Sequence, residues 1–286
     1  MGFGNAVYRP VLESLGHEII TVDPYTPADF KTVDAACIVN KSIDTVHVCT
    51  PNYTHESVAR QAAEYGAKIV FVEKPGVQTS KAWRNLVRDY PNTRFMMVKN
   101  NQYRDEINHF KDLAGRCEIV QITWNNNNRI PRPGSWFTDR ELAFGGVSRD
   151  LIPHMLSYYC AFTDYKQGVK LFAKADQRWK LSDIDSSDYG PVYPDGVYNV
   201  DDFCELEFKN NNTRYVLTAN WRTLEKSEIS ISFGQAYSSV RHELGLCPES
   251  AYQQMIATAV KNINNDAFWQ DQLNQDTWIH QQIEKL

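Results

Sequence analysis

Three side chains with acid–base chemistry lie on, or directly after, predicted elements of this chain. Lys74, in Glu73-Lys74-Pro75, follows the apolar run Ile69–Val72, at the carboxyl edge where open parallel sheets bind ligands. Asp150 and His154 are four residues apart, so on a helix they share one face. An imidazole titrates near physiological pH, and a lysine amine donates hydrogen bonds to developing negative charge. These residue types therefore predict proton transfer.

The first residues have the order of a dinucleotide-binding fingerprint: a glycine turn, a helix, a second strand and an acidic residue. Gly2 and Gly4, followed by Asn5, would let the backbone approach a pyrophosphate at a helix N-terminus. Asp23, after the predicted strand Glu18–Val22, would accept hydrogen bonds from the ribose hydroxyls and repel a 2′-phosphate. The sequence therefore predicts NAD as cofactor, with NADP as the alternative.

Two features depart from that fingerprint. Val7 stands where the third glycine is expected, and the other interpretation of Gly2 and Gly4 is that they only form a turn. The fingerprint normally follows a buried strand in the middle of the sheet, but only Met1 precedes Gly2. Its loss would leave backbone groups of both neighbouring strands unpaired. We therefore expect a start site assigned too late, or a truncated chain.

The first hundred residues alternate short apolar runs with stretches of helical periodicity, which is typical of a parallel sheet. Between Thr45 and Glu73 a βαβ crossover is nearly complete: a strand, a polar turn, the helix Glu56–Tyr65, Gly66 as the end of that helix, and a second strand. The predicted strands of this region are Glu18–Val22, Thr45–Cys49, Lys68–Val72 and Arg94–Val98.

After Asn100 the predicted strands become longer, alternating and adjacent, which indicates an antiparallel sheet. They are Glu118–Trp124, Lys170–Arg178, Phe203–Phe208, Arg214–Ala219 and Glu228–Phe233. One helix, Val147–Phe162, interrupts them, the tail Ala251–Leu286 is predicted to be helical, and the polar stretches Asn125–Asn128 and Ser182–Asn199 are predicted loops.

The predicted fold class is α/β. Residues 1–98 form a dinucleotide-binding domain with a Rossmann-type parallel sheet whose first strand is missing. Residues 99–286 form an α+β domain for substrate binding and oligomerisation, built on a large, mostly antiparallel sheet. The boundary is expected near Val98–Tyr103.

Several short motifs occur in an order that resembles one known family over most of the chain. They are Thr50-Pro51-Asn52-Tyr53-Thr54-His55, Glu73-Lys74-Pro75, Arg132-Pro133 to Trp136, Gly145-Gly146, Asp150-Leu151-Ile152-Pro153-His154, Asp201-Asp202 and Trp221. The chain resembles the glucose–fructose oxidoreductase and inositol dehydrogenase (Gfo/Idh/MocA) family. The resemblance implies an NAD(P)-dependent oxidoreductase that moves a hydride between nicotinamide and a hydroxyl or keto carbon of a sugar, cyclitol or nucleotide-sugar.

The resemblance also implies that Lys74, Asp150 and His154 face the reacting carbon. His154 would take the hydroxyl proton, Asp150 would orient the imidazole or contact a substrate hydroxyl, and Lys74 would stabilise the alkoxide. Lys74 is the alternative base if burial lowers its pKa. The predicted cofactor contacts are Gly2, Gly4, Asn5, Asp23, Thr50, Pro51, Asn52, His55, Glu73 and Lys74, and the predicted substrate contacts are Tyr103 and Trp136.

Other interpretations stay open. Relatives reduce biliverdin or dihydrodiols, and some bind the dinucleotide as non-catalytic transcriptional regulators. His154 could be a histidine satisfied inside the fold, and Asp150 a carboxylate capped by Arg149 or solvent. His55 more often packs at a helix start, and aromatic residues such as Trp136 more often belong to a core.

The composition bounds the remaining function classes. The net charge of −5 gives no reason to expect nucleic acid or an anionic membrane as partner. No apolar run approaches the roughly 20 residues that span a bilayer, and there is no apolar signal core, so a cytoplasmic location is expected.

The six cysteines lack the close pairing of zinc or redox motifs, so no metal is predicted. The partners expected are a small-molecule substrate and, by analogy with relatives, further copies of the chain as a homodimer or homotetramer.

Overall fold

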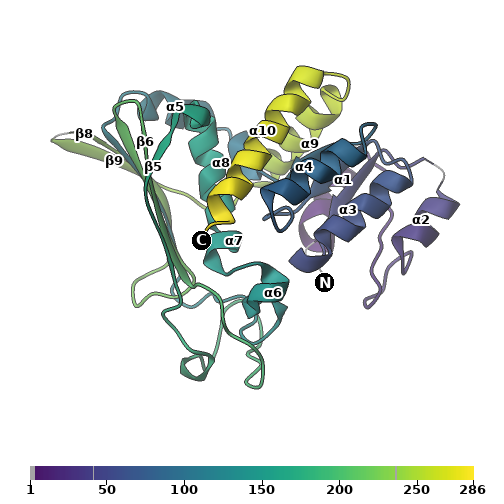
Figure 1. Ribbon diagram of the computed structural model, residues 1–286, viewed down its shortest axis with the longest axis horizontal. Coiled ribbons are helices and arrows are strands. Elements are labelled where there is room, and N and C mark those ends of the chain that lie inside the picture. The colour runs from purple at the N-terminus through teal and green to yellow at the C-terminus, as the bar shows by residue number, and fades with distance from the viewer. Residues whose placement is uncertain (1–3, 41, 236) are drawn as a thin grey trace. The chain divides into compact units, whose positions relative to one another are not determined.

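The chain divides into two compact units, which a computed structural model describes over residues 4–40, 42–235 and 237–286 (Figure 1). The first unit comprises Met1–Tyr103 and Pro248–Glu284, and the second comprises Arg104–Cys247 and Lys285–Leu286. The boundary expected near Val98–Tyr103 coincides with the end of the first stretch. The segment 248–284, which the sequence analysis assigned to the second domain, packs in the first unit instead.

The first unit is built on a parallel sheet of order β1-β2-β3 in its described residues. The strands are β1 (Thr45–Val48), β2 (Ile69–Val72) and β3 (Arg94–Met97), in parallel register throughout. All four residues of β2 are buried, as expected for an inner strand of a sheet with covered faces. The Rossmann-type parallel sheet predicted from the apolar runs is therefore confirmed.

The described helices of this unit come partly from the first hundred residues, where they alternate with the strands as predicted, and partly from the tail of the chain. They are α1 (Arg9–Ser14), α2 (Val33–Val39), α3 (His55–Glu64), α4 (Ser80–Asp89), α9 (Glu249–Lys261) and α10 (Asp266–Ile283), with a π-helical turn at Gly4–Tyr8 and 3-10 turns at Asn52–Thr54 and Asn100–Tyr103. Helix α3 ends before Gly66, whose φ of 82° suits glycine. Helix α10, yellow in Figure 1, lies along α4 and β3.

The prediction of a strand at Glu18–Val22 is wrong. Only Val22 forms a β-bridge, to Phe30, and the backbone of this segment bonds locally, with Phe30 donating to the Thr21 carbonyl and accepting from Asp23. An apolar run becomes a strand only where a neighbouring strand offers a ladder of hydrogen bonds. In the described residues this segment has only the single bridge.

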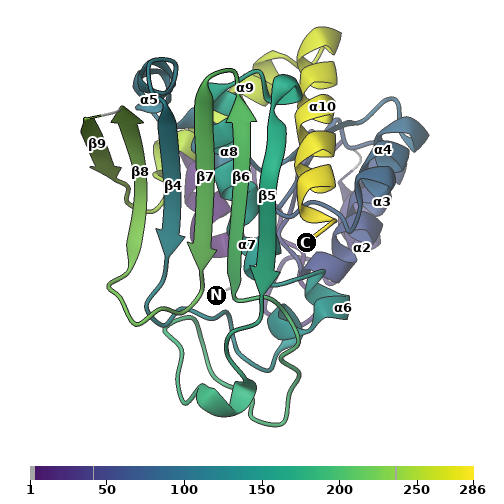
Figure 2. The ribbon, with the colours of Figure 1, turned by 60° about the vertical axis from the view of Figure 1, so that its left-hand side comes forward.

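The second unit contains a six-stranded sheet of order β5-β6-β7-β4-β8-β9, seen side by side in Figure 2. The strands are β4 (Ile119–Asn125), β5 (Val169–Asp176), β6 (Phe203–Asn210), β7 (Thr213–Asn220), β8 (Glu228–Gln235) and β9 (Ser238–Glu243). Only the β4–β7 pairing among them is parallel, which confirms the mostly antiparallel sheet. Strand β9 was not predicted, because its residues Ser-Ser-Val-Arg-His-Glu lack an apolar face.

The described helices of the second unit are α5 (Ile107–Ala114), α6 (Arg140–Ala143), α7 (Val147–Asp150) and α8 (Ile152–Phe162), with 3-10 turns at Trp136–Thr138, Tyr165–Gln167 and Leu181–Asp183. Helices α7 and α8 pack on the six-stranded sheet, α5 packs on α8, and α6 packs on the 3-10 turn before it. The single helix predicted over Val147–Phe162 is two helices separated by Leu151, because Pro153 has no N–H to donate to the preceding turn. Tyr159 of α8 contacts Phe208 and Tyr215, at ring centroid distances of 4.9 and 5.0 Å.

Candidate active site

In the first unit, the candidate site residues include the Lys74 loop, residues 73–77, which leaves the carboxyl end of β2. Glu73 is almost fully buried, and its Oε1 accepts a 2.6 Å hydrogen bond from the Tyr8 hydroxyl while Oε2 accepts one from the Lys74 amide. The Gly76 amide donates to the Glu73 carbonyl at 2.9 Å. Lys74 itself is half-buried. The loop is thus fixed by its own backbone and by a tyrosine from the N-terminal helix.

The turn Gly4–Tyr8 lies over the carboxyl ends of β1 and β2. A Cβ on Gly4 would lie 3.7 Å from the Cβ of Cys49, the residue directly after β1, and Tyr8 reaches Glu73 after β2. Burial raises the pKa of Tyr8 well above its ordinary value, and the nearby Glu73 carboxylate raises it further. Tyr8 therefore stays protonated and keeps donating to Glu73. A helix N-terminus at this edge of a parallel sheet is the arrangement that binds pyrophosphate.

The polar turn after β1 carries three of the predicted cofactor residues: Thr50, Pro51 and Asn52. The Thr54 amide donates to the Pro51 carbonyl at 2.9 Å, and the Thr54 hydroxyl lies 2.7 Å from both that carbonyl and the Thr50 hydroxyl. The three predicted residues are half-buried. The turn therefore presents them at the same sheet edge as the Lys74 loop.

His55 is buried, and its ring contacts the protein backbone on both sides. Nδ1 lies 2.8 Å from the Gly76 carbonyl oxygen and Nε2 lies 2.8 Å from that of Thr50. Burial lowers the pKa of His55, while the two carbonyls oppose that effect. The imidazole therefore links the turn after β1 to the Lys74 loop, as expected for a histidine that packs at a helix start.

The remaining predicted cofactor residues lie near the N-terminus. Asp23 forms a local turn in which Oδ1 accepts 2.8 Å hydrogen bonds from the amides of Tyr25 and Thr26, and these bonds lower its pKa. The side chain of Asn5 accepts a 3.2 Å hydrogen bond from Arg9. Gly2 lies outside the described residues.

Residues of α10 that were not predicted from the sequence contact the Lys74 loop. His280 Nε2 accepts a hydrogen bond from the Val77 amide at 3.1 Å. One turn earlier, the buried Asp276 pairs with the buried Lys99 and accepts from the Met97 amide. The signal available in the sequence was the four-residue spacing of Asp276 and His280 on a predicted helix, but it does not show which surface the helix covers.

In the second unit, the candidate residues lie between Gly145-Gly146 and α8. The buried Asp201 caps the start of α7, because its carboxylate accepts from the amides of Gly146 and Ser148 at 2.9 and 2.7 Å and from the Ser148 hydroxyl at 3.0 Å. A Cβ on Gly146 would lie 1.8 Å from the Asp201 carbonyl oxygen, so only glycine fits. The glycine pair and Asp201 thus fix the helix that carries Asp150.

Two tryptophans hold the predicted catalytic residues of this unit. Trp221 Nε1 donates a 2.8 Å hydrogen bond to Asp150 Oδ2, and the ring of Trp124 stacks on His154 at 5.5 Å between centroids. Trp124 lies near the end of β4, and Trp221 follows the end of β7, the strand that pairs in parallel with β4. Asp150 is the last residue of α7 and His154 is the third residue of α8, and both are half-buried. Both side chains therefore contact rings at the same end of two neighbouring strands.

The two predicted substrate residues belong to different units. Tyr103 ends a 3-10 turn of the first unit, and burial raises its pKa. Trp136 stacks on Phe137 in the second unit, with centroids 3.8 Å apart. Both are half-buried.

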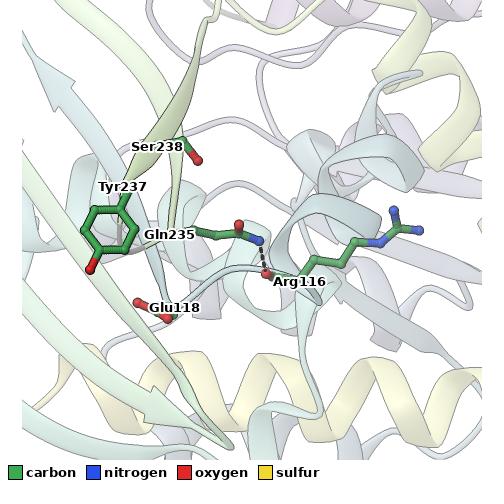
Figure 3. A pocket seen from close by; sticks show the side chains of 5 residues that line it. All are labelled: Arg116, Glu118, Gln235, Tyr237 and Ser238. Carbon is green, nitrogen blue, oxygen red and sulfur yellow. Dashed lines mark hydrogen bonds between the residues drawn. The ribbon is translucent and has the colours of Figure 1, made fainter.

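A shallow hollow elsewhere on the second unit contains none of these residues. It is lined by Arg116, Glu118, Gln235, Tyr237 and Ser238, and Gln235 donates to the Arg116 carbonyl across it (Figure 3). No group of three or more His, Cys, Asp or Glu side chains in the described ranges is placed to hold a metal ion. No helix in the same ranges has the length and apolarity needed to cross a membrane.

A parallel sheet with a helix start and polar turns at its carboxyl edge defines the dinucleotide-binding class of Rossmann folds. Residues 16–96 match the sequence model of the oxidoreductase family with an NAD-binding Rossmann fold, Gfo/Idh/MocA. The motifs Thr50 to His55 and Glu73-Lys74-Pro75, on which the resemblance to this family partly rests, lie within the matched residues.

Comparisons over longer stretches agree with this assignment. A putative UDP-kanosamine synthase oxidoreductase subunit from Amycolatopsis mediterranei (strain S699) is 30% identical over 169 residues, which are 54% of this chain and 47% of that protein. The chain matches only about half the length of its curated relatives. Among solved structures, GenD2 from gentamicin A biosynthesis, in complex with NAD, has a TM-score of 0.68 at 17% identity, over 90% of this chain and 79% of that one. The WlbA (WbpB) dehydrogenase from Thermus thermophilus has a TM-score of 0.71 at 12% identity, over 100% and 92%. These two structures show the shared fold.

Proposed function

We propose that the protein is an NAD(P)-dependent dehydrogenase that moves a hydride between nicotinamide and a hydroxyl or keto carbon of a sugar, cyclitol or nucleotide-sugar. The observation that carries the proposal is the Lys74 loop, a buried and hydrogen-bonded loop that presents a lysine at the carboxyl edge of an NAD-binding Rossmann sheet. The curated relative named as a UDP-kanosamine synthase subunit supports the sugar or nucleotide-sugar class.

The described residues fit a dinucleotide. The helix start at Gly4 packs on Cys49 and offers amide groups for a pyrophosphate. The turn Thr50–Asn52 and the Lys74 loop border the same edge. Asp23 is ionised, since its hydrogen bonds lower its pKa, and a carboxylate at this place in the fingerprint favours NAD over NADP by repelling a 2′-phosphate.

In the oxidation direction, bound NAD supplies the hydride acceptor. In this proposal Lys74 Nζ donates hydrogen bonds to the substrate oxygen and stabilises the negative charge that grows on it. His154 takes the hydroxyl proton as the C–H bond breaks, and the stacked Trp124 ring restricts its orientation. Asp150, with Oδ2 held by Trp221, orients the imidazole or a substrate hydroxyl.

The test is a titration of NADH and NADPH followed by nicotinamide fluorescence, and then a screen of sugars, cyclitols and nucleotide-sugars with both oxidised cofactors. We expect NADH to bind and at least one compound class to be turned over. Lys74→Ala and His154→Ala should each lower kcat by roughly 10²- to 10⁴-fold. Binding without any turnover would instead indicate a non-catalytic dinucleotide-binding regulator, and no binding of either nucleotide would overturn the proposal.

We also propose that the protein works as a homodimer or homotetramer formed through the six-stranded sheet. Strand β5, at one edge of that sheet, exposes Val169, Leu171 and Phe172, and contiguous exposed apolar side chains favour association. Light scattering should give at least twice the chain mass of 32.9 kDa. A monomer at all concentrations would contradict this proposal.

A further inference from the structure

One peptide group of the Lys74 loop lies between two buried histidines. It is the Gly76–Val77 peptide: its carbonyl oxygen lies 2.8 Å from His55 Nδ1, and its N–H donates to His280 Nε2 at 3.1 Å. His55 and His280 are almost completely buried. They come from α3 and α10, which are more than two hundred residues apart in the chain. The peptide is two residues from Lys74.

The role of His280 in this contact is chemically defined. Because Nε2 accepts the Val77 N–H, the neutral ring carries its proton on Nδ1, which lies 2.6 Å from the Asp276 carbonyl oxygen and donates to it. The ring also stacks on Trp83 at 5.4 Å between centroids. His280 is therefore fixed by a bond to its own helix, by a ring contact and by the loop.

The close packing of this contact leaves little freedom to the loop. A Cβ on Gly76 would lie 2.5 Å from His280 Nε2, and Gly76 has a φ of 79°. Helix α10 is itself anchored on the first unit on both sides of His280: Asp276 pairs with Lys99, and Glu284 accepts from the amide and hydroxyl of Ser80 at 2.7 and 3.0 Å. The Lys74 loop is therefore held in place by a helix that is itself fixed on the first unit.

We propose that His280 is a positioning residue for Lys74, which acts by accepting the Val77 N–H and so fixes the loop from which the lysine projects. The inference rests on the proposed function, because it gives Lys74 a place in the reaction. An enzyme group displaced by about 1 Å can lose about a hundredfold in rate. A buried amide that loses its acceptor also favours rearrangement of its loop.

The experiment compares His280→Phe with His280→Gln. Phenylalanine keeps a ring against Trp83 but offers no acceptor to Val77, whereas the glutamine side-chain oxygen can take the place of Nε2. The first readout is the rate of hydrogen exchange of the Val77 amide. The second is the rate of reductive methylation of Lys74 by formaldehyde and cyanoborohydride, divided by the rate for the exposed Lys81 in the same sample. We expect exchange roughly tenfold faster in His280→Phe, Lys74 methylation changed at least threefold, and both largely restored in His280→Gln.

Ser80→Ala is the matched control. It removes the hydroxyl that bonds to Glu284 and so weakens the docking of α10 without touching the Lys74 loop. It should leave Val77 exchange and Lys74 methylation close to wild type. If Ser80→Ala changed both readouts as much as His280→Phe, or if His280→Phe left both unchanged, the positioning role would be overturned.

The two proposals can fail separately. NADH titration of the wild-type protein tests the dehydrogenase proposal and does not involve His280. With a turned-over substrate in hand, His280→Phe should lower kcat at least tenfold with KM changed less than threefold, and His280→Gln should recover most of it. Normal kcat in His280→Phe alongside faster Val77 exchange would overturn positioning while leaving the dehydrogenase proposal intact.

Discussion

The indole of Trp221 donates a 2.8 Å hydrogen bond to Asp150 Oδ2, and Trp221 is almost fully buried. A bond from a fixed donor to a carboxylate is worth about 1.5–3 kcal/mol. It links the end of β7 to the α7 residue for which we propose a role in catalysis. The contact explains why a tryptophan follows β7, where packing alone would accept another aromatic ring.

We predict that Trp221→Phe lowers kcat by roughly tenfold, because the ring still fills its site while Asp150 loses the bond that orients it. Steady-state kinetics with a substrate from the proposed screen measure the effect. Trp179→Phe is the control, since its Nε1 donates to the Arg222 carbonyl instead. Equal kcat in wild type and Trp221→Phe would show that the hydrogen bond has no part in turnover.

Substitution by alanine is expected to destabilise the protein more at Gly146 than at Gly16. Gly146→Ala would place a Cβ 1.8 Å from the Asp201 carbonyl oxygen. Gly16 has open space around it, so Gly16→Ala would only place alanine in the unfavourable left-handed conformation, at a φ of 77°. We expect Gly16→Ala to cost about 1–2 kcal/mol of unfolding free energy and Gly146→Ala to cost more than about 3 kcal/mol. Urea unfolding measures both, and a Gly146→Ala protein as stable as wild type would contradict the close approach.

The buried ring of His47 predicts loss of stability in acid. Burial lowers its pKa to about 3, and neither ring nitrogen has a hydrogen-bond partner among the described residues. Below its ordinary pKa of about 6.5 the unfolded chain binds a proton that the folded chain does not. His47 therefore has no effect on the pH dependence of stability above about pH 6.5. Between about pH 6.5 and about pH 3 it lowers the free energy of unfolding by up to about 1.4 kcal/mol for each unit that the pH falls.

His47→Leu should remove that slope while keeping an apolar side chain between Tyr8 and Phe71. Hydrogen exchange of β2 amides at several pH values between 4 and 7 reports the first unit alone. His109→Gln, at an exposed site of the second unit, should leave the profile unchanged. An unaltered slope in His47→Leu would mean that other groups cause the acid sensitivity.

The sequence predicted the elements whose signal is local. The apolar runs before Cys49 and Glu73 became β1 and β2 because buried parallel strands need little more than β-branched residues and turns. Gly66 was equally informative, since α3 ends before it as predicted, whereas the break at Leu151 ahead of Pro153 was not predicted. The polar strand β9 was missed because its order comes from pairing with β8.

What the sequence could not predict was long-range assignment. Helix α10 has polar and apolar residues on several faces, and nothing in its periodicity indicated that it returns to the first unit. The roles of His280 and Asp276 depend on that return. Lys74, Asp150 and His154 were proposed from the order of motifs in the chain, while the contacts of Trp221 with Asp150 and of Trp124 with His154 became evident only from the structure.

Asp23 gives a test of cofactor preference in which the fold should stay the same. Its Oδ1 accepts from the amides of Tyr25 and Thr26, and the side-chain oxygen of Asn can accept the same two bonds. Asp23→Asn therefore removes the charge but keeps the turn. Since a carboxylate repels a 2′-phosphate, we expect the ratio of the NADPH to the NADH dissociation constant to fall roughly tenfold, measured by nicotinamide fluorescence. Asp29→Asn, also on this loop, is the control for general charge, and the same fall there, or no fall in Asp23→Asn, would show that Asp23 does not contact the adenosine ribose.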